Sequence, residues 1–217
     1  MQSKVLINIH RHGPAHTNEW AIENRHAHFQ QPLPGFYSAG IHPWYIDAHW
    51  ETYLQQIHVL STQPNMMAIG ECGLDSICTT PFPLQQKVFA AQINLANQLN
   101  KPIIIHAVRT HEQVLQLLKK QHNHVPVIFH GYNKGLPLAI KIQEQGYYLS
   151  FGKDILKPAT RHVLALLNPT QLFLETDDAP MAIETVYQQA SAALNISIDE
   201  LSLQLYKNRQ RVFKLQQ

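Results

Sequence analysis

Short apolar runs recur along this chain, and most of them end in a histidine or a carboxylate. The clearest is Met67-Ala68-Ile69-Gly70-Glu71, in which the pattern of a buried strand stops at an acid. A carboxylate at the tip of a buried strand costs desolvation free energy unless it is paired or bound to a metal ion. We therefore expect the rest of the chain to supply partners for Glu71.

Helical patterns separate these apolar runs. The runs typical of strands are residues 5–10, 36–41, 67–71, 101–106, 125–130, 147–151 and 172–177, with a less regular one at 20–25. Helical spacing of apolar residues is found at 47–60, 84–99, 110–120, 136–145, 158–167, 183–194 and 198–206. Continuous apolar strands that alternate with amphipathic helices are typical of a parallel sheet covered by helices.

This alternation predicts an α/β fold of the (β/α)8 TIM-barrel class, somewhat trimmed, with a metal site at the C-terminal ends of the strands. An open doubly wound sheet is the alternative, although no glycine-rich phosphate loop follows the first apolar run. The 217 residues are enough for one sizeable domain, and we predict a single domain over residues 1–217.

The composition excludes several classes of protein. Apolar residues make up 45% of the chain, but no run approaches the length of about 18 that would span a membrane. The N-terminus has no secretion-signal pattern, so we expect a cytoplasmic location. Cys72 and Cys78 are too few for a disulfide framework. The net charge of +2 indicates no strong footprint for nucleic acid, and no feature identifies an obligate protein partner.

Side chains with metal-binding chemistry come at the ends of the apolar runs. They are His10, His12, Glu71, His106, His130 and Asp177. The C-terminal ends of the strands meet on one face of a parallel barrel, and this mixture of nitrogen and carboxylate ligands suits divalent cations. Four histidines and two carboxylates exceed the three protein ligands of a single catalytic zinc.

We therefore predict one or two divalent ions, which could be zinc, manganese or magnesium. Glu71 is the expected bridge between two ions, and a metal-activated water is the expected nucleophile. Asp177 would bind metal while it orients that water. Asp75 is either a supporting residue that fixes a histidine tautomer or the N-cap of a loop.

The arrangement of these residues along the chain resembles a known family, the TatD family of metal-dependent hydrolases in the amidohydrolase superfamily. The motifs that carry the resemblance are His10-x-His12, Gly40-x-His42-Pro43, Gly70-Glu71-x-Gly73-Leu74-Asp75, Pro102-x-x-x-His106, His130-Gly131 and Leu174-Glu175-Thr176-Asp177. The likeness runs from residue 5 to the end, where Asn208–Phe213 looks like the family's closing helix.

The resemblance implies a (β/α)8 barrel that hydrolyses phosphodiesters, typically those of DNA. It places one metal among His10, His12, Glu71 and Asp177, and a second among Glu71, His106 and His130. It also implies that His42 is a substrate-facing or supporting residue. Cations that follow strand ends could receive phosphate, namely Arg11, Arg109, Lys134 and Lys153.

The chain departs from the family pattern at three places. Asn8 stands where family members usually carry aspartate, which implies weaker support for the first histidines. The segment between His12 and Gly35 is short, so the second β/α unit is cut down, and the usual long loop after Asp177 is nearly absent. Because those loops shape the substrate rim, the departures affect the choice of substrate more than the chemistry.

Three functions are compatible with these patterns. The first is a metal-dependent phosphodiesterase, most simply a deoxyribonuclease, which predicts basic side chains around the metal. The second is a metal-dependent ester or amide hydrolase, for example of aminoacyl esters, which predicts a small closed pocket with few cations. The third is a metal- or nucleic-acid-binding protein without catalysis.

Overall fold

The computed structural model describes residues 5–26, 28–29 and 34–213. Its internal contacts divide the chain into two compact units. The central unit is Asn24–Val127, and the terminal unit combines Met1–Glu23 with Ile128–Gln217. The division falls inside two strands of the sheet. One domain over residues 1–217 stays a prediction.

In the part of the chain that the structure describes, eight strands follow one another in a single sheet in the order of the sequence. They are β1 (Leu6–Arg11), β2 (Glu19–Arg25), β3 (Tyr37–Ala39), β4 (Met66–Asp75), β5 (Ile103–Val108), β6 (Val127–Phe129), β7 (Tyr148–Phe151) and β8 (Leu172–Leu174). Five of the neighbouring pairs are β1–β2, β3–β4, β4–β5, β6–β7 and β7–β8, and all five are parallel. Within the terminal unit, a further parallel bridge joins Arg11 at the end of β1 to Asp177 beyond β8.

Seven α-helices and three 3₁₀ helices lie between and after the strands in the described residues. The α-helices are α1 (Trp50–Leu60), α2 (Phe82–Leu99), α3 (His111–Lys120), α4 (Leu136–Glu144), α5 (Pro158–Ala165), α6 (Ile183–Leu194) and α7 (Ile198–Phe213). The 3₁₀ helices are η1 (Pro43–Tyr45), η2 (Lys153–Leu156) and η3 (Pro169–Gln171). Parallel strands in chain order with interleaved helices are the (β/α)8 TIM-barrel class predicted from the sequence.

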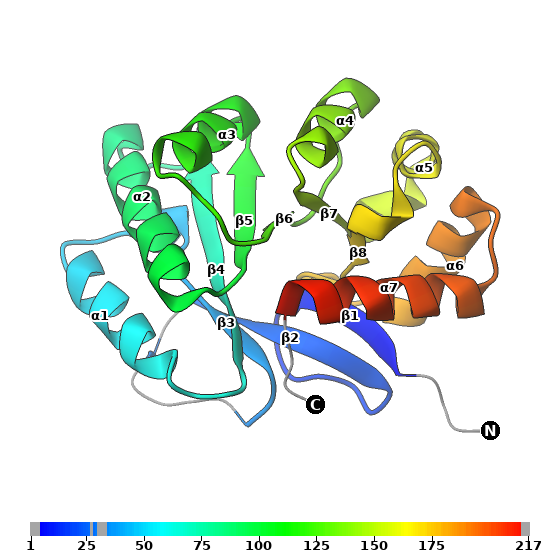
Figure 1. The fold of residues 1–217 in the computed structure, drawn as a ribbon, viewed down its shortest axis with the longest axis horizontal. Coiled ribbons are helices and arrows are strands. Elements are labelled where there is room, and N and C mark those ends of the chain that lie inside the picture. Colours follow the sequence, from blue (N-terminus) through cyan, green and yellow to red (C-terminus); the bar gives the residue numbers. More distant parts are fainter. Residues whose placement is uncertain (1–4, 27, 30–33, 214–217) are drawn as a thin grey trace. The chain divides into compact units, whose positions relative to one another are not determined.

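In the central unit, α2 and α3 lie along β4 and β5 (Figure 1). Ile69 and Ile104 on the strands and Val88 on α2 are fully buried. The β-branched run Ile103-Ile104-Ile105 favours a strand because branched side chains pack well on a pleated surface. Helix α2 ends where Asn100 takes a left-handed conformation with φ 51°.

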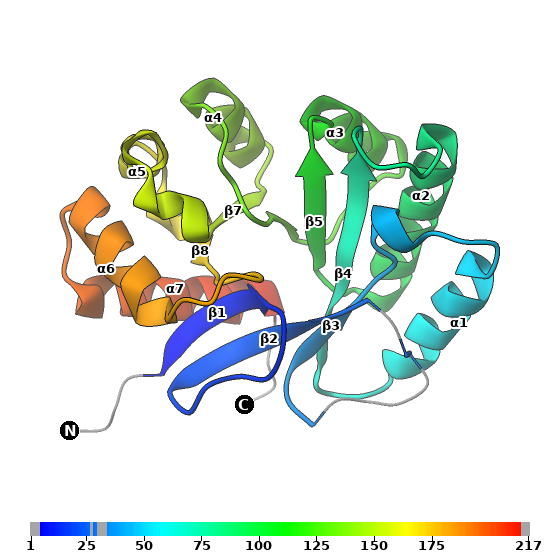
Figure 2. The same ribbon diagram turned by 180° about the vertical axis from the view of Figure 1, so that it is seen from behind.

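In the terminal unit, α6 and α7 pack against β1 and β8 (Figure 2). The core there contains Ile9, Phe173 and Val186, which are all fully buried. Helix α7 joins the helical pattern predicted over 198–206 to the closing helix Asn208–Phe213 that the resemblance implied, and Val212 and Phe213 continue its buried face beyond Tyr206.

The trimming predicted from the sequence lies at the start of the chain. The link from β1 to β2 consists of residues 12–18 and contains no helix. Seven extended residues reach about 23 Å, which is enough to return along a six-residue strand. Among the described residues between β2 and β3 there is no helix either, and the less regular run near Trp20 is confirmed as β2.

Several predicted boundaries are wrong in detail, such as that of β8, which ends at Leu174 rather than at Asp177. Helix α1 begins at Trp50 rather than at Asp47, whose Oδ1 instead accepts a hydrogen bond from the His49 backbone N–H. Strand β4 does not end at Glu71 but continues to Asp75, because Gly73, Leu74 and Asp75 pair with the extension of β5 from His106 to Val108.

No helix in the described residues is long and apolar enough to cross a membrane. Cys72 and Cys78 are both free thiols, and Cys72 is buried.

Candidate metal centre

Glycines shape the strand that carries Glu71. Gly70 and Gly73 have φ of 143° and 148°, which side chains rarely adopt. A Cβ at Gly70 would overlap the carbonyl oxygen of Ile104, and one at Gly73 would overlap that of His106. The two glycines therefore allow β4 to run close against β5 on either side of Glu71.

The central unit holds a cluster of three side chains with metal-binding chemistry, which we call the Glu71 cluster. It consists of His42, Glu71 and His106, and each residue offers a ligand atom within 4.8 Å of the others. Glu71 Oε1 lies 2.8 Å from His106 Nδ1 and 3.3 Å from His42 Nε2. Glu71 is 4% exposed, so its carboxylate is held out of water against two imidazoles. Sequence reasoning assigned His42 only a supporting or substrate-facing position.

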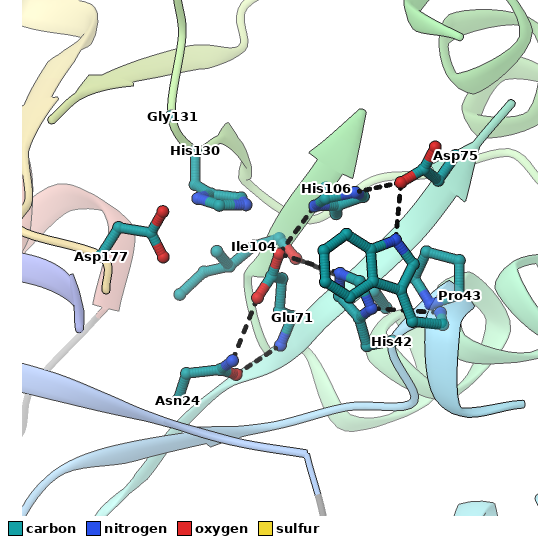
Figure 3. Close-up of polar contacts among 12 residues, drawn as sticks. Asn24, His42, Pro43, Glu71, Asp75, Ile104, His106, His130, Gly131 and Asp177 are labelled. Atoms are coloured by element: carbon teal, nitrogen blue, oxygen red, sulfur yellow. Dashed lines mark hydrogen bonds and ion pairs between the residues drawn. The ribbon is translucent and has the colours of Figure 1, made fainter. Parts of the chain in front are cut away.

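Asn24 holds the Glu71 carboxylate in place. Its side-chain amide donates to Glu71 Oε2 over 3.0 Å and accepts the Glu71 backbone N–H over 3.0 Å (Figure 3). The nitrogen and the oxygen of the Asn24 amide therefore both form hydrogen bonds with Glu71. Asn24 lies 47 positions from Glu71 and belongs to no motif that sequence analysis singled out.

Asp75 contacts the ring nitrogen of His106 that does not face Glu71, as a supporting residue would. Its Oδ2 is 3.2 Å from His106 Nε2 and accepts the Trp44 indole N–H over 2.7 Å (Figure 3). Its Oδ1 accepts the Ile77 backbone N–H over 2.9 Å. Burial alone would raise the pKa of Asp75, but the hydrogen bonds from Trp44 and Ile77 and the neighbouring His106 hold that pKa below the usual aspartate range. An ionised Asp75 can fix the tautomer and the orientation of the His106 ring.

The terminal unit holds a second cluster around Asp177, which we call the Asp177 cluster. It consists of His10, His12, His130, Glu175 and Asp177, which form two overlapping groups of possible ligands. Asp177 Oδ1 lies 3.4 Å from His12 Nε2 and 3.6 Å from His10 Nε2. The rings of His10 and His130 are 4.4 Å apart between centroids.

The backbone sets the position of Asp177. Its N–H donates to the His10 carbonyl, and its own carbonyl accepts the His12 N–H, each over 3.0 Å. Asp177 also has a positive φ of 52°, which is uncommon for a residue other than glycine. Burial would raise the pKa of its carboxyl group, but hydrogen bonds from His10 and His12 and the nearby His130 hold that pKa well below the usual range.

Glu175 belongs to the Asp177 cluster, although sequence reasoning did not assign it a role. Its Oε1 accepts the Gly131 backbone N–H over 2.8 Å and lies 3.2 Å from His130 Nδ1. Its Oε2 is buried and has no hydrogen-bond partner among the described residues. The position of Glu175, two residues before Asp177 in a strand-end motif, was the one signal in the sequence that could have identified it.

The donor sets of both clusters fit a divalent cation. Each combines imidazole nitrogens with a carboxylate, the mixture that zinc and manganese accept. A buried carboxylate oxygen without a hydrogen-bond partner, as at Glu175, costs desolvation free energy unless positive charge lies next to it. The described residues of the two clusters could therefore hold a metal ion.

The cations predicted to receive phosphate differ in their burial and in their ion pairs. Arg11 is buried and forms an ion pair with Glu19 over 2.6 Å, and Lys153 pairs with Asp178 over 2.7 Å. Arg109 is exposed just beyond β5 with a positive φ of 57°. No hydrogen bond or ion pair joins Arg109 to the Glu71 cluster in the described part of the chain, so its role toward substrate stays a prediction.

Parallel strands with interleaved helices and clusters of histidine and carboxylate at the strand ends define the class of TIM-type metal-dependent hydrolases. A sequence profile of the family described as TatD related DNase matches residues 15–214. The chain belongs to this family, and the resemblance predicted from its motifs is confirmed.

Similar proteins agree with this membership. YjjV of Escherichia coli K12, called an uncharacterized metal-dependent hydrolase, is 33% identical over 159 residues, which are 70% of this chain and 61% of YjjV. The 3′-5′ ssDNA/RNA exonuclease TatD of Yersinia pseudotuberculosis is 27% identical over 204 residues, which are 82% of this chain and 77% of that protein. The crystal structure of YjjV matches with a TM-score of 0.76 and 27% identity, and covers 83% of this chain and 77% of its own. This chain thus aligns in sequence with less than two thirds of YjjV.

Proposed function

We propose that this chain is a metal-dependent phosphodiesterase that cleaves nucleic acid, most simply DNA, with zinc or manganese as the working ion. The observation that carries the proposal is the pair of histidine and carboxylate clusters around Glu71 and Asp177. The name of the Yersinia relative, an exonuclease of single-stranded DNA and RNA, supports a nucleic-acid substrate.

In this proposal His42, Glu71 and His106 hold metal in the central unit, and His10, His12 and Asp177 hold metal in the terminal unit. His130 and Glu175 complete the Asp177 cluster. The sharing of Glu71 between two ions, expected from the sequence, stays part of the proposal. Imidazole-rich sites favour zinc or manganese over magnesium, which prefers oxygen ligands and keeps its waters.

When bound, a divalent cation supplies Lewis acidity that stabilises the negative charge on the phosphoryl oxygens. The residues of this chain position the candidate ligands and the attacking water. Asn24 fixes the Glu71 carboxylate, and Asp75 orients His106. Because its pKa is lowered, Asp177 is ionised at neutral pH and can bind a metal ion and accept a hydrogen bond that orients an attacking water.

The first test is hydrolysis of bis(p-nitrophenyl) phosphate and of single-stranded DNA by protein that has been stripped of metal and resupplied with zinc, manganese or magnesium. Removing a residue that only supports a ligand lowers metal affinity or activity by 10- to 100-fold in other metal sites. We therefore expect Glu71→Gln to lower kcat/KM by at least about 100-fold.

Glu184→Gln is the matched control, because Glu184 is an exposed residue of α6, and it should retain full activity. Metal binding without cleavage of either phosphodiester would contradict the proposal and favour a carbon-centred ester or amide as substrate. Full metal-dependent turnover by Glu71→Gln would contradict the role given to Glu71.

A further inference from the structure

Two exposed aromatic residues follow His42 in the central unit. Trp44 is 57% exposed and Tyr45 is 50% exposed. Many other aromatic side chains of the described residues, such as Tyr37 and Phe129, are buried. The Tyr45 ring lies 5.6 Å from the ring of His42, and the Trp44 ring lies 5.0 Å from it. The rings are therefore next to the Glu71 cluster and open to solvent.

Hydrogen bonds hold these rings in position. The Trp44 backbone N–H donates to His42 Nδ1, and the Tyr45 backbone N–H donates to the His42 carbonyl. The Trp44 indole N–H donates to the buried Asp75. Because the segment is already ordered, it loses little conformational entropy when a ligand stacks on it.

A cavity of about 570 Å³ opens beside Tyr45, within the size range of small-ligand sites. Its lining is His26, His28, Phe29, Tyr45, Asp47, Tyr53 and Gln56. The His26 and Tyr45 rings are stacked, with centroids 5.0 Å apart and planes 26° from parallel. Phe29 lies within 6.0 Å of Tyr53, between ring centroids, so much of the wall is aromatic.

The chemistry of this wall suits a nucleobase better than a phosphate. Aromatic faces stack on any base, which makes such recognition tolerant of sequence. Among the described residues that line the cavity, the acidic one is Asp47, whose Oδ2 accepts the Tyr53 hydroxyl over 2.9 Å. A carboxylate repels a phosphate but can accept N–H groups from the edge of a base.

We propose that this cavity, with Tyr45 as its stacking surface, binds an unpaired nucleobase of the strand whose phosphodiester is cleaved. The inference rests on the proposed function and deepens it, because it assigns a subsite for one base of the substrate beside the Glu71 cluster. In a duplex the base would be stacked and paired, and a base-free phosphodiester would leave the cavity empty. Tyr45 is here a specificity-determining residue that touches substrate and takes no part in the chemistry.

The test compares two unlabelled ligands of equal length, a short oligothymidylate and the corresponding abasic oligonucleotide. Their binding to metal-free protein is measured by calorimetry, and their kcat/KM is measured after metal is restored. Loss of one stacked base is expected to weaken binding by about 5- to 150-fold. We expect Tyr45→Ala to show this loss with the oligothymidylate in both measurements, and no change with the abasic ligand.

Tyr45→Phe retains the ring and should behave as the unaltered protein. Tyr206→Ala is the matched control, because Tyr206 is a 42% exposed tyrosine on α7 in the terminal unit. Circular dichroism checks that each variant is folded. If Tyr45→Ala weakens the binding and cleavage of the two ligands equally, or affects neither ligand, the base site is overturned.

The two proposals fail in different ways. A protein that binds oligothymidylate through Tyr45 but cleaves neither ligand with any metal would contradict the phosphodiesterase and leave base binding supported. A protein that cleaves both ligands equally, with no effect of Tyr45→Ala, would support the phosphodiesterase and overturn the base site.

Discussion

Asn8 connects β1 to the segment that carries Asp177. Its amide group donates to Thr176 Oγ1 over 2.9 Å and to Glu19 Oε2 over 3.4 Å, and its carbonyl accepts the Thr176 N–H over 3.1 Å. The side chain is fully buried. An aspartate, which the family resemblance leads one to expect, accepts but does not donate when ionised. The amide thus supplies one hydrogen bond here that a carboxylate could not, the one donated to Glu19, whereas the Thr176 hydroxyl could itself donate to a carboxylate.

We predict that Asn8→Asp lowers the free energy of unfolding at pH 7 by about 2–4 kcal/mol, because it buries a second carboxylate beside Glu19 and removes the hydrogen bond donated to Glu19. The deficit should shrink as the pH falls, since protonation removes the buried charge and restores a donor. Urea unfolding followed by circular dichroism at pH 7 and pH 5 measures both effects.

Asn18→Asp is the control for Asn8→Asp, because Asn18 is exposed in the same part of the chain. A surface change of this kind should shift the free energy of unfolding by no more than about 0.5 kcal/mol. Equal stability of the Asn8→Asp variant and the unaltered protein would show that the amide donors contribute nothing.

Helix α2 supports the Glu71 cluster through two buried glutamines. Gln92 accepts the Ile41 N–H over 2.7 Å and donates to the Ile41 carbonyl over 3.1 Å, just before His42. Gln85 pairs in the same way with the backbone of Asp75, over 2.8 Å and 3.0 Å. The chain has left the strand ladder at Ile41, since β3 ends at Ala39. The helix therefore provides the hydrogen bonds that a neighbouring strand would otherwise make.

We predict that Gln92→Leu lowers the free energy of unfolding by about 2–3 kcal/mol, because the Ile41 N–H and carbonyl lose their partner while they stay buried. Gln98→Leu serves as the control on the exposed side of the same helix. The measurement is urea unfolding of metal-free protein, with hydrogen exchange of the Ile41 amide as a local readout. An unchanged exchange rate at Ile41 in Gln92→Leu would refute the assignment.

At the scale of the whole molecule, each of the two compact units carries its own cluster of histidine and carboxylate. The ligands of each cluster come from parts of the chain that are far apart in sequence, as with His10 and Asp177 or His42 and His106. An ion bound to such a cluster binds the folded chain and not the unfolded one. Metal binding and folding are therefore thermodynamically linked.

We predict that zinc or manganese at a free concentration of 100 times its dissociation constant raises the free energy of unfolding by about 2.7 kcal/mol for each site. Glu71→Gln and Asp177→Asn should each reduce this gain, whereas Glu184→Gln should retain it. Thermal unfolding of chelator-treated protein during metal titration, with metal content measured by mass spectrometry, provides the test. No stabilisation by any divalent ion would contradict the metal centre.

The sequence by itself determined the fold class, the family and most residues of the two clusters. Apolar periodicity and strand-end position are local properties, so His10, His12, His106, His130 and Asp177 could be predicted without contacts. Only the tertiary structure decided which groups support them. Asn24 meets Glu71 across 47 positions, and Trp44 meets Asp75 across 31. The buried glutamines of α2 likewise resemble solvent-facing residues in the sequence, because hydrogen-bond partners are chosen by folding and not by spacing along the chain.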